Sequence, residues 1–128
     1  MGRVDNWESI LISQIETCSN KMFRWGSHDC ASFAIKTAEM ISGQKFDVPR
    51  WKTKAEAMAL LEEKSIDEWA DIAWEPIDKN YVRRGDIVAT MTNGEMALGI
   101  YVSPTGAFTA KNGICYVPFE SLIKAWRV

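Results

Sequence analysis

The 128-residue chain has ordinary globular composition, with 47% apolar and 25% charged residues and a formal net charge of −2. This length predicts one domain over residues 1–128, which buries roughly two-thirds of the surface that the unfolded chain exposes. The small negative charge gives no long-range attraction for nucleic acid, and no apolar run approaches the roughly 18 residues that a membrane span needs. We therefore expect neither a nucleic acid partner nor a membrane partner.

The N-terminal residues, Met1 to Asp5, lead directly into an amphipathic segment without the pattern of a signal peptide. We therefore expect the protein to be cytoplasmic on synthesis. Its three cysteines, Cys18, Cys30 and Cys115, are odd in number and far apart, which favours reduced thiols over a disulfide framework. The methionines and tryptophans form no cofactor box, so no cofactor is expected.

The first predicted helix follows a possible capping box, in which Asp5 precedes Glu8 by three residues. Apolar residues then recur at helical spacing until about residues 19–20: Trp7, Ile10, Leu11, Ile15 and Cys18. This pattern predicts that Cys18 lies in the core.

The second predicted helix begins where an aromatic loop with a glycine, residues 23–26, gives way to an apolar helical pattern that ends at Gly43. Cys30 lies in its first turn, where unpaired backbone N–H groups and the helix dipole favour a thiolate. Cys30 is therefore a candidate nucleophile. The alternative is a packed thiol, because free cysteine is among the most buried residue types.

An ordered loop is expected over residues 43–51, followed by two further helices that each begin with a capping box. Thr53 and Glu56 form the first box, and Ser65 and Glu68 form the second. The large apolar side chains of these helices, such as Met58 and Trp69, indicate core or helix-face packing.

From residue 80 onward the apolar pattern changes to the period of β-strands. Strands are predicted over residues 85–91, 97–102, about 108, and 114–117, with turns at Asn93-Gly94, at residues 104–106 and at Asn112-Gly113. A short helix is predicted over residues 119–124. The chain should therefore be an α+β domain, with a helical part over about residues 5–75 packed on an antiparallel sheet over about residues 82–118.

The segment His28-Asp29-Cys30-Ala31-Ser32-Phe33, preceded by Trp25-Gly26, resembles the nucleophile segment of the NlpC-type cell-wall peptidases, a papain-like superfamily of cysteine peptidases. It is similar also to short proteins from phage and prophage tail gene clusters, which share Trp-Gly-x-His-Asp-Cys-Ala and the ending Ala125-Trp126-Arg127-Val128. The resemblance implies a cysteine helix followed by a sheet that supplies the other catalytic groups. It also implies partners among phage tail proteins or cell-wall peptides, and a possible place in the virion.

The catalytic positions of that superfamily are altered in two strands. The segment Arg84-Gly85-Asp86-Ile87 is similar to the opening of the first strand of those enzymes. In the next strand, however, Ala97 stands where the resemblance implies the histidine base. In the third strand Ala110 stands at the polar third position, with Thr109 and Lys111 beside it. Alanine can neither accept nor donate a proton, so these two catalytic groups are missing.

The only histidine, His28, precedes Cys30 by two residues. It is either a displaced base that pairs with the thiol, or a structural residue that holds the loop while Asp29 caps the helix. A metal site made of His28 and Cys30 with Cys18 or Cys115 is a third possibility. The ligand spacing is poor for zinc, so no metal is expected.

Three functional hypotheses follow. The first is a phage or prophage tail-assembly or tail-tip protein on a peptidase fold that has lost catalysis. The second is an active cysteine hydrolase of peptidoglycan peptides or other amides, with Cys30 as nucleophile and His28 as base. The third is a module that binds a peptide or partner protein, for which Trp25, Asp29 and Tyr101 are the candidate binding residues.

Overall fold

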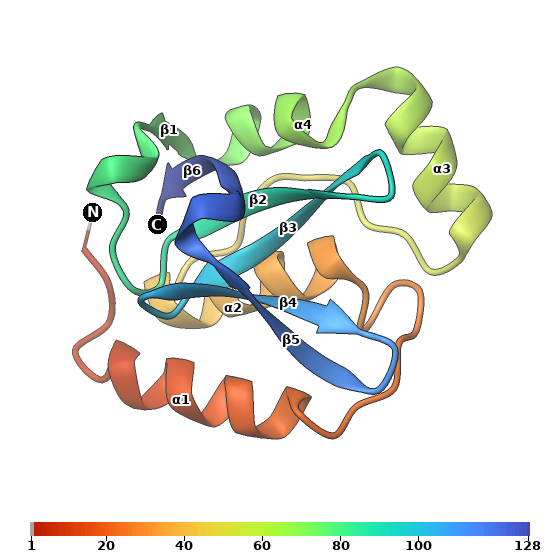
Figure 1. Cartoon of the computed structure of the whole chain (residues 1–128). Coiled ribbons are helices and arrows are strands. Elements are labelled where there is room, and N and C mark those ends of the chain that lie inside the picture. The colour runs from red at the N-terminus through yellow and green to blue at the C-terminus, as the bar shows by residue number, and fades with distance from the viewer. Residues whose placement is uncertain (1) are drawn as a thin grey trace.

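Four helices lie on one face of a six-stranded antiparallel sheet in the computed structural model, which describes residues 2–128 (Figure 1). The helices are α1 (Trp7–Cys18), α2 (Cys30–Ser42), α3 (Lys54–Glu63) and α4 (Ile66–Ala73). The strands are β1 (Glu75–Ile77), β2 (Ile87–Thr92), β3 (Glu95–Tyr101), β4 (Thr105–Ala110), β5 (Gly113–Pro118) and β6 (Leu122–Arg127). This confirms the predicted α+β class. Within residues 2–128 no helix is long and apolar enough to cross a membrane.

Capping side chains fix the starts of three helices as predicted. The boxes of Thr53 with Glu56 and of Ser65 with Glu68 open α3 and α4. The side chain of Asp29 opens α2 by accepting a hydrogen bond from the Ser32 N–H. The predicted capping box at Asp5 is wrong, because α1 begins one residue later, after Asn6, with no side-chain cap.

The central sheet has the strand order β1-β6-β2-β3-β4-β5. Strands β2 to β5 form the predicted antiparallel meander, with a tight Asn93-Gly94 turn between β2 and β3. Both turn residues have positive φ, the conformation that favours Asn-Gly in two-residue hairpins.

The C-terminal segment differs from the sequence-based expectation. The predicted short helix over residues 119–124 is wrong: Phe119–Ser121 form a 3-10 turn, and Leu122–Arg127 form β6. β6 pairs with both β1 and β2, so the sheet extends well beyond residues 82–118. Pairing on both sides buries Ala125 and Trp126 almost completely, and this long-range gain overrides the local helical pattern.

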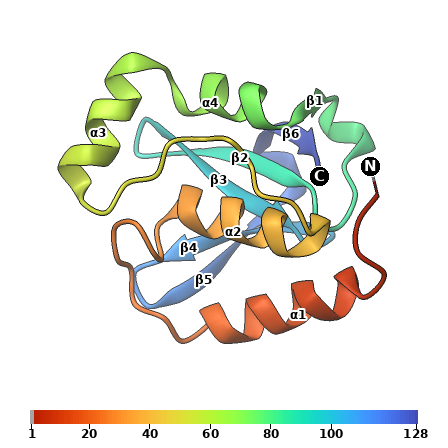
Figure 2. The ribbon, with the colours of Figure 1, turned by 180° about the vertical axis from the view of Figure 1, so that it is seen from behind.

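The main hydrophobic core lies between the helices and the sheet. Helix α2 runs across the middle of this face with α1 and α4 on either side, as the view from behind shows (Figure 2). The buried residues of this core include Leu11, Cys18, Phe33, Ala34, Ile41, Ile87, Leu98, Ile100 and Trp126. This confirms the predicted core position of Cys18. A smaller cluster on the opposite face holds Val88, Tyr101, Phe108, Leu122 and Ala125.

Both ends of the described chain meet at Asp86, whose side chain is fully buried. Its Oδ1 accepts hydrogen bonds from Arg3 Nη2 at 2.8 Å and from the Val128 N–H at 3.1 Å. Its Oδ2 accepts a hydrogen bond from the Arg83 N–H at 2.9 Å and lies 3.2 Å from Arg127 Nε. A buried carboxylate is stable only when it is paired in this way, so Asp86 has a structural role.

Candidate functional site

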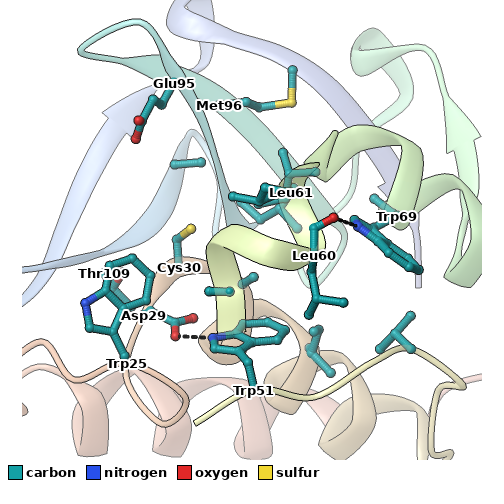
Figure 3. A pocket seen from close by; sticks show the side chains of 18 of the residues that line it. Trp25, Asp29, Cys30, Trp51, Leu60, Leu61, Trp69, Glu95, Met96 and Thr109 are labelled. Carbon is teal, nitrogen blue, oxygen red and sulfur yellow. Dashed lines mark hydrogen bonds between the residues drawn. The ribbon is translucent and has the colours of Figure 1, made fainter. Parts of the chain in front are cut away.

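A pocket of about 360 Å³ opens at the N-terminal end of α2, beside Cys30 (Figure 3). Its walls come from the α2 start, the loop before α3, helices α3 and α4, and the β2–β3 hairpin. Most of the lining side chains are apolar, and four are tryptophans: Trp25, Trp51, Trp69 and Trp74. The ionisable groups in the lining are the Cys30 thiol and the carboxylates of Asp29 and Glu95.

Asp29 organises the floor of this pocket. Its Oδ1 accepts a hydrogen bond from the Ser32 N–H at 2.8 Å, which caps α2. Its Oδ2 accepts hydrogen bonds from the Gly26 N–H at 2.7 Å and from the Trp51 indole N–H at 2.8 Å. One buried carboxylate thus fixes the helix start, the preceding loop and an aromatic wall. The candidate binding residue Asp29 does line the pocket, but its acceptor positions already serve the fold.

Gly26 lets the loop before α2 approach the segment that precedes α3. It has φ +82°, and a Cβ there would lie 2.6 Å from the Trp51 carbonyl oxygen and 2.8 Å from Lys52 Cα. Any other residue would therefore push the two segments apart. This close approach holds Trp51 against the Cys30 end of the pocket.

The Cys30 thiol is partly exposed in the pocket lining. Burial is the largest influence on its pKa and raises it; the backbone N–H of Leu98 lowers it, and the neighbouring Asp29 carboxylate raises it again, so that the net direction is upward. The expected thiolate at the helix start is therefore outweighed by desolvation and by a nearby negative charge. The thiol is neutral at pH 7.

His28 does not contact this thiol through any hydrogen bond found among residues 2–128. Its ring is buried, and Nε2 donates a hydrogen bond to the Gly113 carbonyl at 3.1 Å. The edge of the ring also packs against Phe33. His28 therefore connects the loop before α2 to the β4–β5 hairpin. This is the arrangement expected of a structural residue that holds the loop. The pairing that a displaced base needs is not formed.

The two alanines of the sheet lie in different places. Ala97 is part of the pocket lining together with Cys30, and it also packs against the cluster on the other face of the sheet that holds Tyr101. The position where the resemblance implies a base therefore carries no functional group. Ala110 is outside the pocket lining, and its neighbour Thr109 lines the pocket instead. The hydroxyl of Thr109 cannot act as a base at neutral pH.

The candidate aromatic contacts separate in the structure. Trp25 lines the pocket and packs edge-on against Phe23, with ring centroids 5.0 Å apart. Tyr101 lies on the opposite face of the sheet, against Phe119. Side chains alternate along a strand, so Tyr101 faces away from the helix side that Leu98 faces. Tyr101 therefore lies outside the pocket lining to which Trp25 belongs.

Several pocket residues were not predicted as site residues. Trp51 comes from the irregular loop, and Met58, Leu61 and Trp69 come from helices that the sequence indicated only as packing surfaces. No local motif marks them. They converge on the pocket only because α3 and α4 fold back over the α2 start.

The possible metal ligands do not gather at one point. Cys18 is buried in the core, Cys115 is exposed on β5, and Cys30 lies in the pocket. In the part of the chain that the structure describes, no three His, Cys, Asp or Glu side chains group to hold a metal ion.

A sequence comparison with family models matches residues 2–128 to the family described as "Domain of unknown function (DUF6950)". A comparison with curated proteins gives no match.

The fold is similar to solved NlpC/p60 structures. The NlpC/p60 domain of the peptidoglycan hydrolase SagA is 11% identical, with a TM-score of 0.60, over 94% of this chain and 97% of that one. RipD of Mycobacterium tuberculosis, described as a non-catalytic NlpC/p60 domain protein adapted to peptidoglycan binding, is 10% identical, with a TM-score of 0.58, over 95% and 97%. The Resuscitation Promoting Factor Interacting protein RipA is 14% identical, with a TM-score of 0.61; the match covers 95% of this chain but only 62% of that one. The expected NlpC-like fold is confirmed at this level.

Proposed function

We propose that this chain, which belongs to the DUF6950 family, is a non-catalytic protein on an NlpC/p60-type fold that uses the pocket at Cys30 to hold a partner. The observation that carries this proposal is the makeup of the pocket: among residues 2–128 its lining holds Cys30 and Ala97 but no histidine. Of its two carboxylates, Asp29 already accepts three hydrogen bonds from the fold, and Glu95 lies at the β2–β3 hairpin. Cysteine hydrolysis needs a group that takes the thiol proton and returns it to the leaving group. A lone neutral thiol cannot complete that cycle.

Two further features support the loss of catalysis. The pKa of Cys30 is raised by burial, whereas a nucleophilic cysteine needs a lowered one. The Nε2 of the buried His28 ring is already used in a hydrogen bond to the Gly113 carbonyl. RipD, described as non-catalytic, is a precedent for an NlpC/p60 fold without hydrolysis.

The finer part of the proposal is a role in phage or prophage tail assembly or at the tail tip, with association with the virion. It rests on the resemblance of the segment from Trp25 to Ala31 and of the ending Ala125-Trp126-Arg127-Val128 to short tail-cluster proteins. The partner would then be another tail protein or a cell-wall peptide.

Catalysis is tested by incubating the purified protein with peptidoglycan and measuring released muropeptides by mass spectrometry, with the SagA domain as positive control. We expect no release above the level of the Cys30→Ala variant. Release that Cys30→Ala abolishes would overturn the non-catalytic proposal, and loss of that release in His28→Ala as well would favour the hydrolase hypothesis.

The tail role is tested separately by deleting the gene from its phage or prophage and imaging the tails by electron microscopy. We expect defective tails and lower infectivity, restored equally by the wild-type gene and by Cys30→Ala, since no chemistry at the thiol is required. Normal tails and full infectivity after deletion would remove the assembly role.

A further inference from the structure

We propose that the pocket at Cys30 binds an apolar, non-acidic peptide segment of a partner protein, in preference to an acidic cell-wall peptide. This inference rests on the proposed function, because it assumes a pocket that holds a ligand without hydrolysing it. It goes further by assigning the chemistry of that ligand.

The charges of the pocket lining disfavour an acidic ligand. Among residues 2–128, the lining includes the carboxylates of Asp29 and Glu95 and no lysine, arginine or histidine. Peptidoglycan stem peptides carry free carboxylates, which would meet no cation in the lining itself; the Lys64 ammonium lies outside it, 4.7 Å from the centroid of the Trp69 ring. Desolvating an unpaired carboxylate beside two others is unfavourable, so the lining selects a neutral or cationic segment.

The rim of the pocket continues the apolar lining out to solvent. Three of its residues are large, apolar and exposed: Phe23 at 40%, Met58 at 41% and Leu61 at 41%. Exposed apolar residues are ordinary when single, but Met58 and Leu61, one turn apart on α3, and Phe23, before α2, all border the same apolar pocket. A ligand that enters the pocket would bury this rim as well.

The aromatic walls are held in place before any ligand binds. The Trp51 indole N–H donates to Asp29 Oδ2 at 2.8 Å, and the Trp69 indole N–H donates to the Leu60 carbonyl at 2.9 Å. Figure 3 shows both of these hydrogen bonds at the edge of the pocket. Fixed walls lower the conformational cost of binding. The volume of about 360 Å³ is at the lower end of the range for ligand pockets, roughly 300–1,000 Å³, and fits one or two apolar side chains.

A peptide suits the Cys30 end of the pocket better than a plain hydrocarbon does. The backbone N–H groups of Cys30, Ala31 and Leu98 all lie close enough to the thiol to influence its pKa. This end of the pocket therefore presents backbone N–H groups beside the Asp29 carboxylate, and these N–H groups match a peptide carbonyl as acceptor. The apolar remainder matches the side chains of the same segment.

The test uses the full chain and a set of blocked tetrapeptides with three positions drawn from Leu, Met, Phe and Trp and a fourth position that is Gln, Lys or Glu. Occupancy is measured as protection of Cys30 from alkylation, with the exposed Cys115 as internal reference, and independently by tryptophan fluorescence. We expect protection of Cys30 by the Gln and Lys peptides. We expect the Glu peptides and a soluble muropeptide to need roughly tenfold higher concentration, equivalent to about 1.4 kcal/mol.

Met58→Glu on the rim provides the matched variant, and Met40→Glu is its control, because Met40 is 38% exposed on α2 but lies outside the pocket lining. We expect Met58→Glu to weaken the binding of the Gln peptides about fivefold or more and Met40→Glu to leave their binding unchanged. In Glu95→Lys, the Glu peptides should protect Cys30 at the same concentration as the Gln peptides.

Three results would overturn the inference. One is that no peptide in the set protects Cys30. Another is that the muropeptide protects it as well as the best peptide without being cleaved, which would leave the non-catalytic function intact and assign a cell-wall ligand. The third is that 1-octanol protects Cys30 as well as the best peptide does, which would assign the pocket to small apolar molecules. Cleavage of the muropeptide would instead overturn the proposed function itself.

Discussion

Replacing Asp29 with alanine tests whether one carboxylate organises the pocket. The substitution removes the α2 cap, worth about 1 kcal/mol. It also leaves the Gly26 N–H and the Trp51 indole N–H without the acceptor that lies 2.7 and 2.8 Å away. Each lost hydrogen bond to a buried charged acceptor costs about 1–3 kcal/mol. We expect the free energy of unfolding to fall by about 3–6 kcal/mol, since such contributions are not fully additive.

The assay is urea unfolding followed by tryptophan fluorescence and circular dichroism, in which the midpoint should fall while the slope stays constant. The control is Asp47→Ala, which removes an exposed carboxylate and should change stability by no more than about 0.5 kcal/mol.

Asp29→Asn separates charge from shape. It should cost less than alanine, because the side-chain oxygen can still accept from the Ser32 N–H. It also removes the negative charge that raises the pKa of Cys30, so alkylation of Cys30 should begin at lower pH than in the wild type. A loss below about 1 kcal/mol for Asp29→Ala, or an unchanged alkylation profile for Asp29→Asn, would refute the assigned role of this carboxylate.

Three other perturbations probe the site and its support. Ala97→His should restore an imidazole to the pocket lining as a base for the thiol and raise the alkylation rate of Cys30 at pH 7 about tenfold or more, with Cys115 unchanged, as followed by peptide mass spectrometry. Folding raises the pKa of Cys30 and of Cys18, so the folded state holds these protons more tightly than the unfolded state does. The contribution of these two thiols to stability, measured by urea unfolding, should therefore be constant below about pH 8.5 and fall above it, and Cys30→Ala should reduce that fall. Asp86→Ala should lower the free energy of unfolding by about 3–5 kcal/mol, because it removes the buried carboxylate that pairs with the partly buried Arg3 and Arg127; a loss near that of Asp47→Ala would contradict this.

Local signals in the sequence predicted most of the elements correctly. A capping box needs only four residues, and a two-residue Asn-Gly turn needs only two, so α3, α4 and the β2–β3 hairpin are encoded where they form. β6 was missed because its partners, β1 and β2, lie 30 or more residues earlier in the chain. Strand pairing at that separation has no local signature.

The candidate site was predictable to a similar extent. Asp29 and Cys30 were identifiable from the start of α2, and the missing base was identifiable at Ala97. The strand period of two could have placed Tyr101 on the far face, because it is three residues from the inward-facing Leu98. Trp51 and Trp69 could not have been assigned to the pocket, since their convergence depends on how α3 and α4 fold back over α2.

The position of β6 between β1 and β2 has a consequence for how the chain folds while it is being synthesised. β1 and β2 leave the ribosome before β6, and until Leu122–Arg127 emerge, each presents an edge with unpaired backbone groups. Exposed edges of this kind can pair with other chains and start aggregation. A nonsense mutation or proteolytic cut just before Leu122 would therefore leave the whole pocket in the sequence and still yield an insoluble product.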